Sequence, residues 1–343
     1  MKKNIHIIFV IIFAFFMGCE DEKATQQTPS GNLYIVCEGN YGVANASLWS
    51  LDLEDENADV NPNIYEALTG HNLGDVANAM VINQDQLFII NNNSHSLEIM
   101  TLGNHINYLS SIDLAMSSPR YIDFDSHFGY ISTWYNGILV MDLNSNSISD
   151  TIAIDGMAED VIYHQGYLYV SVPLKNDWST NDDVLKIDIA SKTVVDTFNV
   201  IPGPGRLLIS NNTLVVASTY YDPDWNTFAG NSSIDLSTGI VLKKDYGMTF
   251  DYSSDLVEIN GTVYRATTSG VVPLSSDLTP DTTGEIGNFT GVYSVSVIGN
   301  KIVFGVTDDY TAPDQVFITD LTGFLLRTID VGALPTDFVI YNK

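Results

Sequence analysis

Residues 32–53 read NLYIVCEGNYGVANASLWSLDL, and this stretch contains the unit from which the fold is built. Leu33 to Val36 form a short apolar run that is typical of a buried strand. The run leads into the glycine-rich segment from Glu38 to Ala46, and a second strand pattern ends at Ser50-Leu-Asp52. Such a loop is either a plain turn or the rim of a site, and the rest of the chain decides between them.

The first strand signal occurs seven times along the chain. Six intervals of 39 to 54 residues separate the copies, which begin at Leu33, Leu87, Gly129, Leu168, Leu214, Val263 and Ile302. Each of the last six is preceded by another strand and by a hairpin turn of Asn, Asp, Gln or Gly. A third strand and a more polar fourth strand follow in each repeat. Four strands in a unit of about 40–50 residues predict a propeller blade.

The first repeat lacks its leading strand, and the C-terminus supplies one. The segment DFVIYN at residues 337–342 matches the leading strand of the other six repeats. We therefore predict an all-β, seven-bladed β-propeller over residues 32–343, in which the C-terminal strand pairs with the N-terminal strand and closes the ring. Closure removes the open sheet edges that all-β chains must otherwise protect.

The N-terminus has the pattern of a secretory signal. Lys2 and Lys3 precede an apolar run, Ile5 to Phe16, which is too short for a comfortable transmembrane helix. The run ends in Gly18-Cys19, which resembles the bacterial lipobox, where the cysteine is acylated after cleavage.

That resemblance implies a signal peptide over residues 1–18 and a lipidated Cys19 at the start of a polar tether, residues 19–31. The stretch Glu20-Asp21-Glu22-Lys23 resembles the acidic export tag of lipoproteins on the outer face of the outer membrane. We therefore expect an outer-membrane protein that is anchored only by its lipid and faces the cell exterior. With Cys19 acylated, Cys37 has no cysteine partner, and its apolar strand predicts a buried, inert thiol.

The chain is strongly acidic, with 42 Asp and Glu residues against 14 Lys and Arg and a net charge of −28. This field repels nucleic acid and anionic membrane surfaces, so we expect neither as a partner. It suits a soluble domain, or one that binds neutral or cationic ligands.

In a propeller, the loops between second and third strands and the loops that lead to the next blade meet on one face. These segments hold three of the four tryptophans, several tyrosines and amides, and two of the four arginines. Rings and amides suit a large neutral ligand, although aromatic loops also pack against one another. The predicted ligand-binding residues are Asn40, Tyr41, Asn92, Arg120, Trp134, Tyr135, Asn136, Trp178, Arg206, Tyr220 and Trp225.

Motifs for catalysis are scarce. The mature chain has five histidines without metal-site spacing, and it has neither a Gly-x-Ser-x-Gly elbow nor a P-loop. His95 is the only histidine in a rim loop. The aspartates that end most third strands are explained by turn capping. We therefore predict no catalytic residues, no metal site and no cofactor.

The opening Leu33-Tyr-Ile-Val-Cys-Glu-Gly-Asn-Tyr-Gly, followed by Asn45-Ala-Ser-Leu, resembles the Asn-Glu-Gly-Asn-Phe-Gly and Asn-Gly-Ser-Leu motifs of a family of bacterial surface lipoproteins. These are seven-bladed propellers of the YncE-like (DUF5074) kind, and one branch is the vitamin B12-binding BtuG type. Cys37 stands where that family carries Asn.

The resemblance implies that the chain binds a corrinoid and delivers it to an outer-membrane TonB-dependent transporter. In that reading the amides of Asn40, Asn92 and Asn136 meet the corrinoid amides, and Arg120 or Arg206 takes the phosphate of its nucleotide loop. The alternative is a non-catalytic propeller that contacts a protein or a glycan. A propeller enzyme, such as a lactonase or a quinone-dependent dehydrogenase, is a third possibility.

Overall fold

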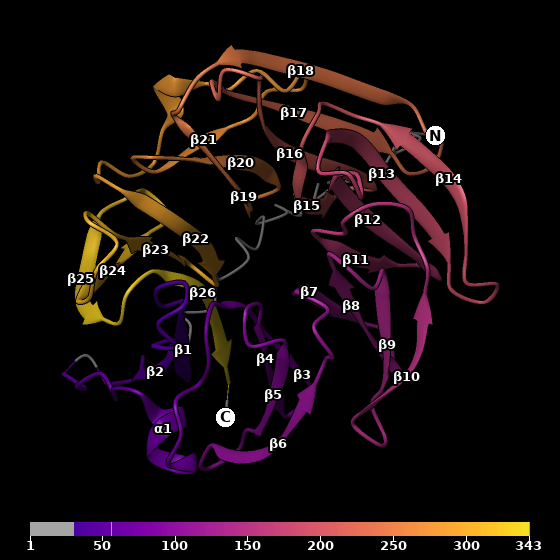
Figure 1. Ribbon diagram of the computed structural model, residues 1–343. Coiled ribbons are helices and arrows are strands. Elements are labelled where there is room, and N and C mark those ends of the chain that lie inside the picture. Colours follow the sequence, from indigo (N-terminus) through magenta and orange to yellow (C-terminus); the bar gives the residue numbers. More distant parts are fainter. Residues whose placement is uncertain (1–30, 56, 343) are drawn as a thin grey trace, which may run out of the picture.

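The computed structural model describes residues 31–55 and 57–342, and it has seven antiparallel sheets arranged around a central axis (Figure 1). The predicted seven-bladed β-propeller is therefore confirmed. The first strand of each blade lies nearest the axis and the later strands lie further out. The predicted signal peptide and Cys19 lie outside the described residues. No helix in the described part of the chain is long and apolar enough to cross a membrane.

The blades are numbered here along the chain. Blade 1 contains β26 (Pro335–Tyr341), β1 (Asn32–Cys37) and β2 (Ser47–Asp52); blade 2 contains β3 (Ala77–Asn83), β4 (Gln86–Asn91), β5 (Ser96–Thr101) and β6 (Asn107–Asp113). Blade 3 contains β7 (Pro119–Phe124), β8 (Phe128–Thr133), β9 (Ile138–Asp142) and β10 (Ser147–Ile152); blade 4 contains β11 (Val161–His164), β12 (Tyr167–Leu174), β13 (Thr180–Asp188) and β14 (Thr193–Asn199).

The remaining blades follow the same order. Blade 5 contains β15 (Pro204–Ser210), β16 (Thr213–Tyr221), β17 (Thr227–Asp235) and β18 (Val241–Met248); blade 6 contains β19 (Tyr252–Ile259), β20 (Thr262–Thr267) and β21 (Val271–Pro273). Blade 7 contains β22 (Val292–Ile298), β23 (Lys301–Val306), β24 (Asp314–Asp320) and β25 (Leu325–Val331).

The ring is closed by strands from the two ends of the chain. β26 pairs antiparallel with β1, placing Phe338 opposite Ile35 and Ile340 opposite Leu33. This is the pairing that the C-terminal repeat fragment predicts. The closing sheet is buried, since Leu33 and Ile35 are 0% exposed and Phe338 is 4% exposed.

Blades 1 and 6 have three strands where the repeat pattern predicts four. In blade 1 the outer position holds a bridge from Asn61 to Ser50, and the short helix α1 (Ile64–Thr69) follows. In blade 6 the third strand ends at Pro273, and the 3₁₀ turn η1 (Thr282–Gly284) follows further along. Ser276 and Asp277 then lie in a turn. Beyond β21, Leu274 N still donates to Val263 O at 2.9 Å, and Leu274 then forms only an isolated bridge with Pro280.

The apolar core lies between the blades. Six clusters of buried side chains each combine residues from two neighbouring blades. Among the described residues, no such cluster joins blades 5 and 6. There the fully buried Arg265 donates to the carbonyl oxygens of Gly230 and Ser218, at 2.8 and 3.1 Å, and to Asn231 Oδ1 at 2.9 Å.

Candidate functional site

The two kinds of loop named above meet on one side of the ring, which we call the top face. Backbone hydrogen bonds join the two kinds of loop: Trp134 N–H donates to Ser118 O, and Thr219 N–H donates to Gly203 O. Trp134, Trp178 and Trp225 occupy corresponding loops of blades 3, 4 and 5. The three tryptophans are therefore gathered on neighbouring blades of one face.

Between blades 4 and 5 the top face has a cavity of about 510 Å³, which we call the aromatic groove. Trp178 is 56% exposed, Tyr221 53% and Trp225 80%, so large apolar surfaces face solvent here. Few monomeric proteins leave such surface open without a binding role. The lining residues are Pro173, Leu174, Trp178, Thr180, Gly203, Thr219, Tyr220, Tyr221, Asp222, Pro223 and Trp225.

Equivalent turns present the two exposed tryptophans. Trp178 N–H donates to Lys175 O at 2.9 Å, and Trp225 N–H donates to Asp222 O at 3.0 Å. Both residues have left-handed backbones, with φ of 67° and 63°. This conformation costs about 1–2 kcal/mol for a residue other than glycine, and it is rare for bulky side chains. The two loops therefore present their tryptophans in the same backbone conformation.

Other aromatic side chains pack against the two exposed tryptophans of the groove. Trp134 packs edge-on against Trp178, with ring centroids 5.8 Å apart, and Tyr221 lies 6.1 Å from Trp225. Trp134 is partly buried, and its Nε1 donates to Glu159 Oε2 at 2.9 Å. Trp134 therefore holds Trp178 in place rather than offering a free surface of its own.

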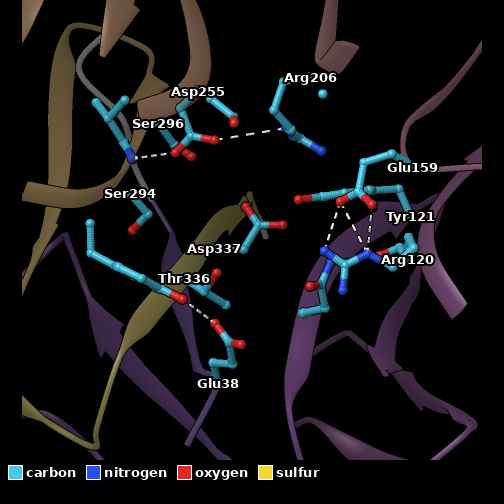
Figure 2. A pocket seen from close by; sticks show the side chains of 15 residues that line it. Glu38, Arg120, Tyr121, Glu159, Arg206, Asp255, Ser294, Ser296, Thr336 and Asp337 are labelled. Carbon is cyan, nitrogen blue, oxygen red and sulfur yellow. Dashed lines mark hydrogen bonds and ion pairs between the residues drawn. The ribbon is translucent and has the colours of Figure 1, made fainter. Parts of the chain in front are cut away.

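A second cavity, of about 300 Å³, lies on the ring axis and is called the axial cavity here (Figure 2). Innermost strands and the loops before them supply most of its walls, and Glu38 comes from the loop after β1. The lining is mainly polar. The lining residues are Glu38, Asn78, Arg120, Tyr121, Glu159, Gly205, Arg206, Ser254, Asp255, Tyr293, Ser294, Val295, Ser296, Thr336 and Asp337.

Both arginines of the predicted site line this cavity and face carboxylates. Arg120 donates to Glu159 through Nε and Nη2, at 3.0 and 2.7 Å. Arg206 lies 3.5 Å from Asp160 and 3.8 Å from Asp255, with its guanidinium 4.0 Å from the centre of the Tyr121 ring. Burial acts to lower the pKa of Arg120, but Glu159 outweighs it and keeps that pKa above its usual value.

Four aspartates in or directly before innermost strands each link their blade to the next: Asp123, which accepts a hydrogen bond from Tyr163 N at 2.7 Å, and three that interact with Arg206. Asp160 accepts a hydrogen bond from Leu207 N, Asp255 from Val295 N and Asp337 from Met80 N, at 2.8, 3.0 and 2.9 Å. Burial raises the pKa of all three, and for Asp337 to about 6, although these hydrogen bonds and Arg206 act in the opposite direction. The axial carboxylates therefore have a structural role and remain costly to ionise.

The other predicted residues are spread over the top face. Asn40 donates its amide to Tyr310 O, and Asn92 donates to Ser118 Oγ and Pro119 O, so both hold loops of neighbouring blades together. Tyr135 and Asn136 are exposed in the loop of blade 3. Tyr41 is 80% exposed in the loop of blade 1, away from the aromatic groove of blades 4 and 5.

The structure thus brings Trp178, Tyr220 and Trp225 together in the aromatic groove and places Arg120 and Arg206 in the axial cavity. Sequence reasoning missed Tyr221 as a groove residue, and it missed the axial acids Glu159, Asp255 and Asp337. A signal was present, because Asp160, Asp255 and Asp337 each directly precede the apolar part of a leading strand.

One group of acidic residues has the geometry to hold a metal ion. Asp308, Asp309 and Asp314 place carboxylate oxygens within 4.8 Å of one another, in the loop before β24 and at its start. Leu334 N already donates to Asp314, and the other two side chains are exposed. Exposed acidic groups of this kind are common without an ion, so the cluster does not define a metal centre.

No protein-family model and no curated protein sequence matches the chain. Several solved structures share its fold at low sequence identity. A hypothetical selenium-binding protein from Sulfolobus tokodaii has a TM-score of 0.66 and 10% identity, over 92% of this chain and 94% of that chain. A quinonprotein alcohol dehydrogenase-like protein from Bacteroides thetaiotaomicron has a TM-score of 0.63 and 13% identity, over 91% and 78%.

Apo AztD from Citrobacter koseri has a TM-score of 0.54 and 11% identity, over 91% of this chain and 98% of that chain. These propellers carry unrelated functional names. Because fold does not determine function at such identities, the similarity establishes the β-propeller architecture and nothing about the ligand.

Proposed function

We propose that this chain is a non-catalytic binding protein that captures a large neutral ligand, a corrinoid, in the aromatic groove. In this proposal it is a surface lipoprotein of the YncE-like kind, and it passes the ligand to an outer-membrane TonB-dependent transporter. The ligand and the partner come from the resemblance of the opening motif, which includes Glu38-Gly-Asn-Tyr-Gly.

The single observation that carries the proposal is the exposed pair Trp178 and Trp225 at the aromatic groove. Broad rings with a polar edge supply contact area at a low cost in side-chain entropy, and Trp and Tyr dominate binding hot spots. The turns hold both tryptophans in a strained backbone conformation. A preorganised surface binds more tightly, because less ordering occurs on association.

The polar groups of the groove favour binding over catalysis. Asp222 is its only carboxylate, and its Oδ1 accepts hydrogen bonds from the backbone N–H groups of Asp224 and Asn226, both at 2.9 Å. The Asn226 side-chain amide, which donates to Asp222 Oδ2 at 2.8 Å, and these backbone bonds lower the pKa of Asp222, which stays ionised and acts as a turn cap. A neutral ligand also suits a chain with a net charge of −28.

Arg120 and Arg206 have no place in this contact set. Each guanidinium faces a carboxylate in the axial cavity, so a phosphate would have to compete with Glu159 or Asp160. We therefore assign ligand contact to the groove rings Trp178, Tyr220, Tyr221 and Trp225, with Trp134 as their support.

Titration of the purified protein with cyanocobalamin by calorimetry tests the proposal. We expect saturable binding, and we expect Trp225→Ala to weaken it by about 10- to 100-fold, as for a hot-spot residue. Tyr41→Ala is the matched control, because Tyr41 is equally exposed but lies in the loop of blade 1. No heat at micromolar protein, or equal affinity in the Trp225 and Tyr41 variants, would remove the proposal.

A further inference from the structure

The axial cavity is separate from the aromatic groove and plays no part in the function proposed above. Its volume of about 300 Å³ corresponds to about ten water molecules at their liquid volume, which is enough for a small organic molecule. Solvent reaches it, since the side chains of Arg206 and Asp255 retain 29% and 25% exposure.

Charge is distributed unevenly across this cavity. On the wall formed by blades 3 to 5, Arg120 is bonded to Glu159 and Arg206 faces Asp160. The facing wall, from blades 6, 7 and 1, contributes carboxylates and hydroxyl groups but no lysine or arginine (Figure 2). Those residues are Glu38, Ser254, Asp255, Ser296, Thr336 and Asp337. The lining as a whole has four carboxylates against two guanidinium groups, so it carries excess negative charge.

Two carboxylates of the facing wall keep a free acceptor. Glu38 Oε2 accepts a hydrogen bond from the Tyr293 hydroxyl, and Asp255 Oδ2 accepts one from Val295 N–H. Within the described chain, no hydrogen bond reaches Glu38 Oε1 or Asp255 Oδ1, and only the 3.8 Å ion pair with Arg206 approaches the latter. Both oxygens are therefore open to a ligand that supplies N–H donors.

We propose that the axial cavity binds a small organic cation whose ammonium groups are held by Glu38, Asp255 and Asp337. Glu38 and Asp255 lie at opposite ends of the facing wall, with Asp337 between them (Figure 2), so a diamine fits better than a monoamine. An ammonium group donates three hydrogen bonds, which matches a wall of carboxylate and hydroxyl acceptors.

Other ligand classes fit this lining less well. An anion meets excess negative charge, and both arginines already face carboxylates. A directly coordinated metal ion needs closely grouped ligand atoms. Among the described residues, only Asp308, Asp309 and Asp314 are so grouped, and they lie outside this cavity.

Burial raises the pKa of Glu38, of Asp255 and, to about 6, of Asp337. A bound cation favours the ionised carboxylates and lowers these pKa values, so binding near pH 6 releases protons. The charged and titratable groups that face Asp337 from the surrounding strands and loops are Glu38, Arg120, Tyr121, Asp123, Glu159, Asp160, Arg206, Asp255 and Tyr293.

The test is calorimetric titration of the purified full chain with 1,4-diaminobutane, in two buffers of different ionisation enthalpy near pH 6. We expect saturable binding with proton release, and no binding of 1,4-butanediol, which has the same length without charge. Glu38→Gln keeps an acceptor for Tyr293 and is expected to weaken diamine binding by about tenfold. Trp225→Ala, in the aromatic groove, should leave it unchanged.

Several outcomes would overturn the inference. One is that 1,4-butanediol binds as tightly as the diamine, and another is that the diamine binds without proton release. The others are that Glu38→Gln leaves the affinity for the diamine unchanged, or that calcium chloride saturates the site in place of the diamine. A corrinoid result does not bear on this site, since the two ligands use different cavities and different variants.

Discussion

At the scale of single residues, Arg265 joins blades 5 and 6, whereas buried apolar side chains join the other pairs of neighbouring blades. It is fully buried between blades 5 and 6 and donates to three backbone carbonyl oxygens, those of Ser218, Gly230 and Ser253. Burial lowers its pKa to about 10, which still leaves the guanidinium charged at neutral pH. The planar fork of arginine suits several fixed acceptors better than the single ammonium of lysine does.

Replacing Arg265 by Met should therefore destabilise the protein. The three carbonyl groups would lose their donor inside the blade interface, and relief of the guanidinium desolvation would recover only part of that cost. We expect the free energy of unfolding to fall by about 2–5 kcal/mol in urea denaturation. Lys244→Met is the control, because Lys244 joins the same two blades through the exposed Asp277, at 3.6 Å. Equal stability of the two variants would show that Arg265 is not the polar link between these blades.

At the scale of elements, β26 decides whether the chain forms a ring or an open array. This strand pairs with β1 and places Phe338 in a cluster with β1 residues and with Val316 and Ile318 of blade 7. The same strand contributes Asp337, which bonds Met80 of blade 2. One strand from the C-terminus thus links blades 7, 1 and 2, and its packing stabilises both ends of the chain.

Truncation of Phe338 tests that role. Phe338→Ala removes a side chain that is 4% exposed, so we expect the free energy of unfolding to fall by about 3–5 kcal/mol. Phe324→Ala makes the same chemical change at a turn residue that is 69% exposed, and its effect should stay within about 0.5 kcal/mol. Urea denaturation of both variants gives the comparison. A loss at Phe338 no larger than at Phe324 would mean that closure contributes little to stability.

At the scale of the whole molecule, the ring must tolerate a net charge of −28. Its ion pairs offset little of that charge, since Lys192–Asp150 and Lys244–Asp277 are exposed pairs that contribute little to stability. Self-repulsion of the remaining carboxylates opposes the compact state. The ring is held by apolar packing between blades and by the aspartate links along the axis.

Salt should therefore stabilise the protein. Raising NaCl from about 50 mM to about 500 mM shortens the Debye length and screens the repulsion, so we expect Tm to rise by a few degrees. Differential scanning calorimetry measures the change. Tetramethylammonium chloride at the same ionic strength should act alike if screening is the cause. A Tm that falls or stays constant in both salts would contradict this account.

The sequence alone determined the ring and its seven blades. It did so through the repeated strand patterns, the turn residues between them and the leading strand at residues 337–342. Local patterning sufficed because each blade is a unit of neighbouring segments. The sequence also placed Trp134, Trp178 and Trp225 in loops of one face.

Only the tertiary structure decided which of these residues meet. It gathered Trp178, Tyr220, Tyr221 and Trp225 into one groove, and it placed the partly buried Trp134 against Trp178 as a support. It also paired Arg120 with Glu159, 39 residues apart, and Arg206 with acids of blades 4 and 6. Such contacts depend on the radial arrangement of blades around the axis. Residues far apart in the chain become neighbours there, so no sequence interval encodes their distance.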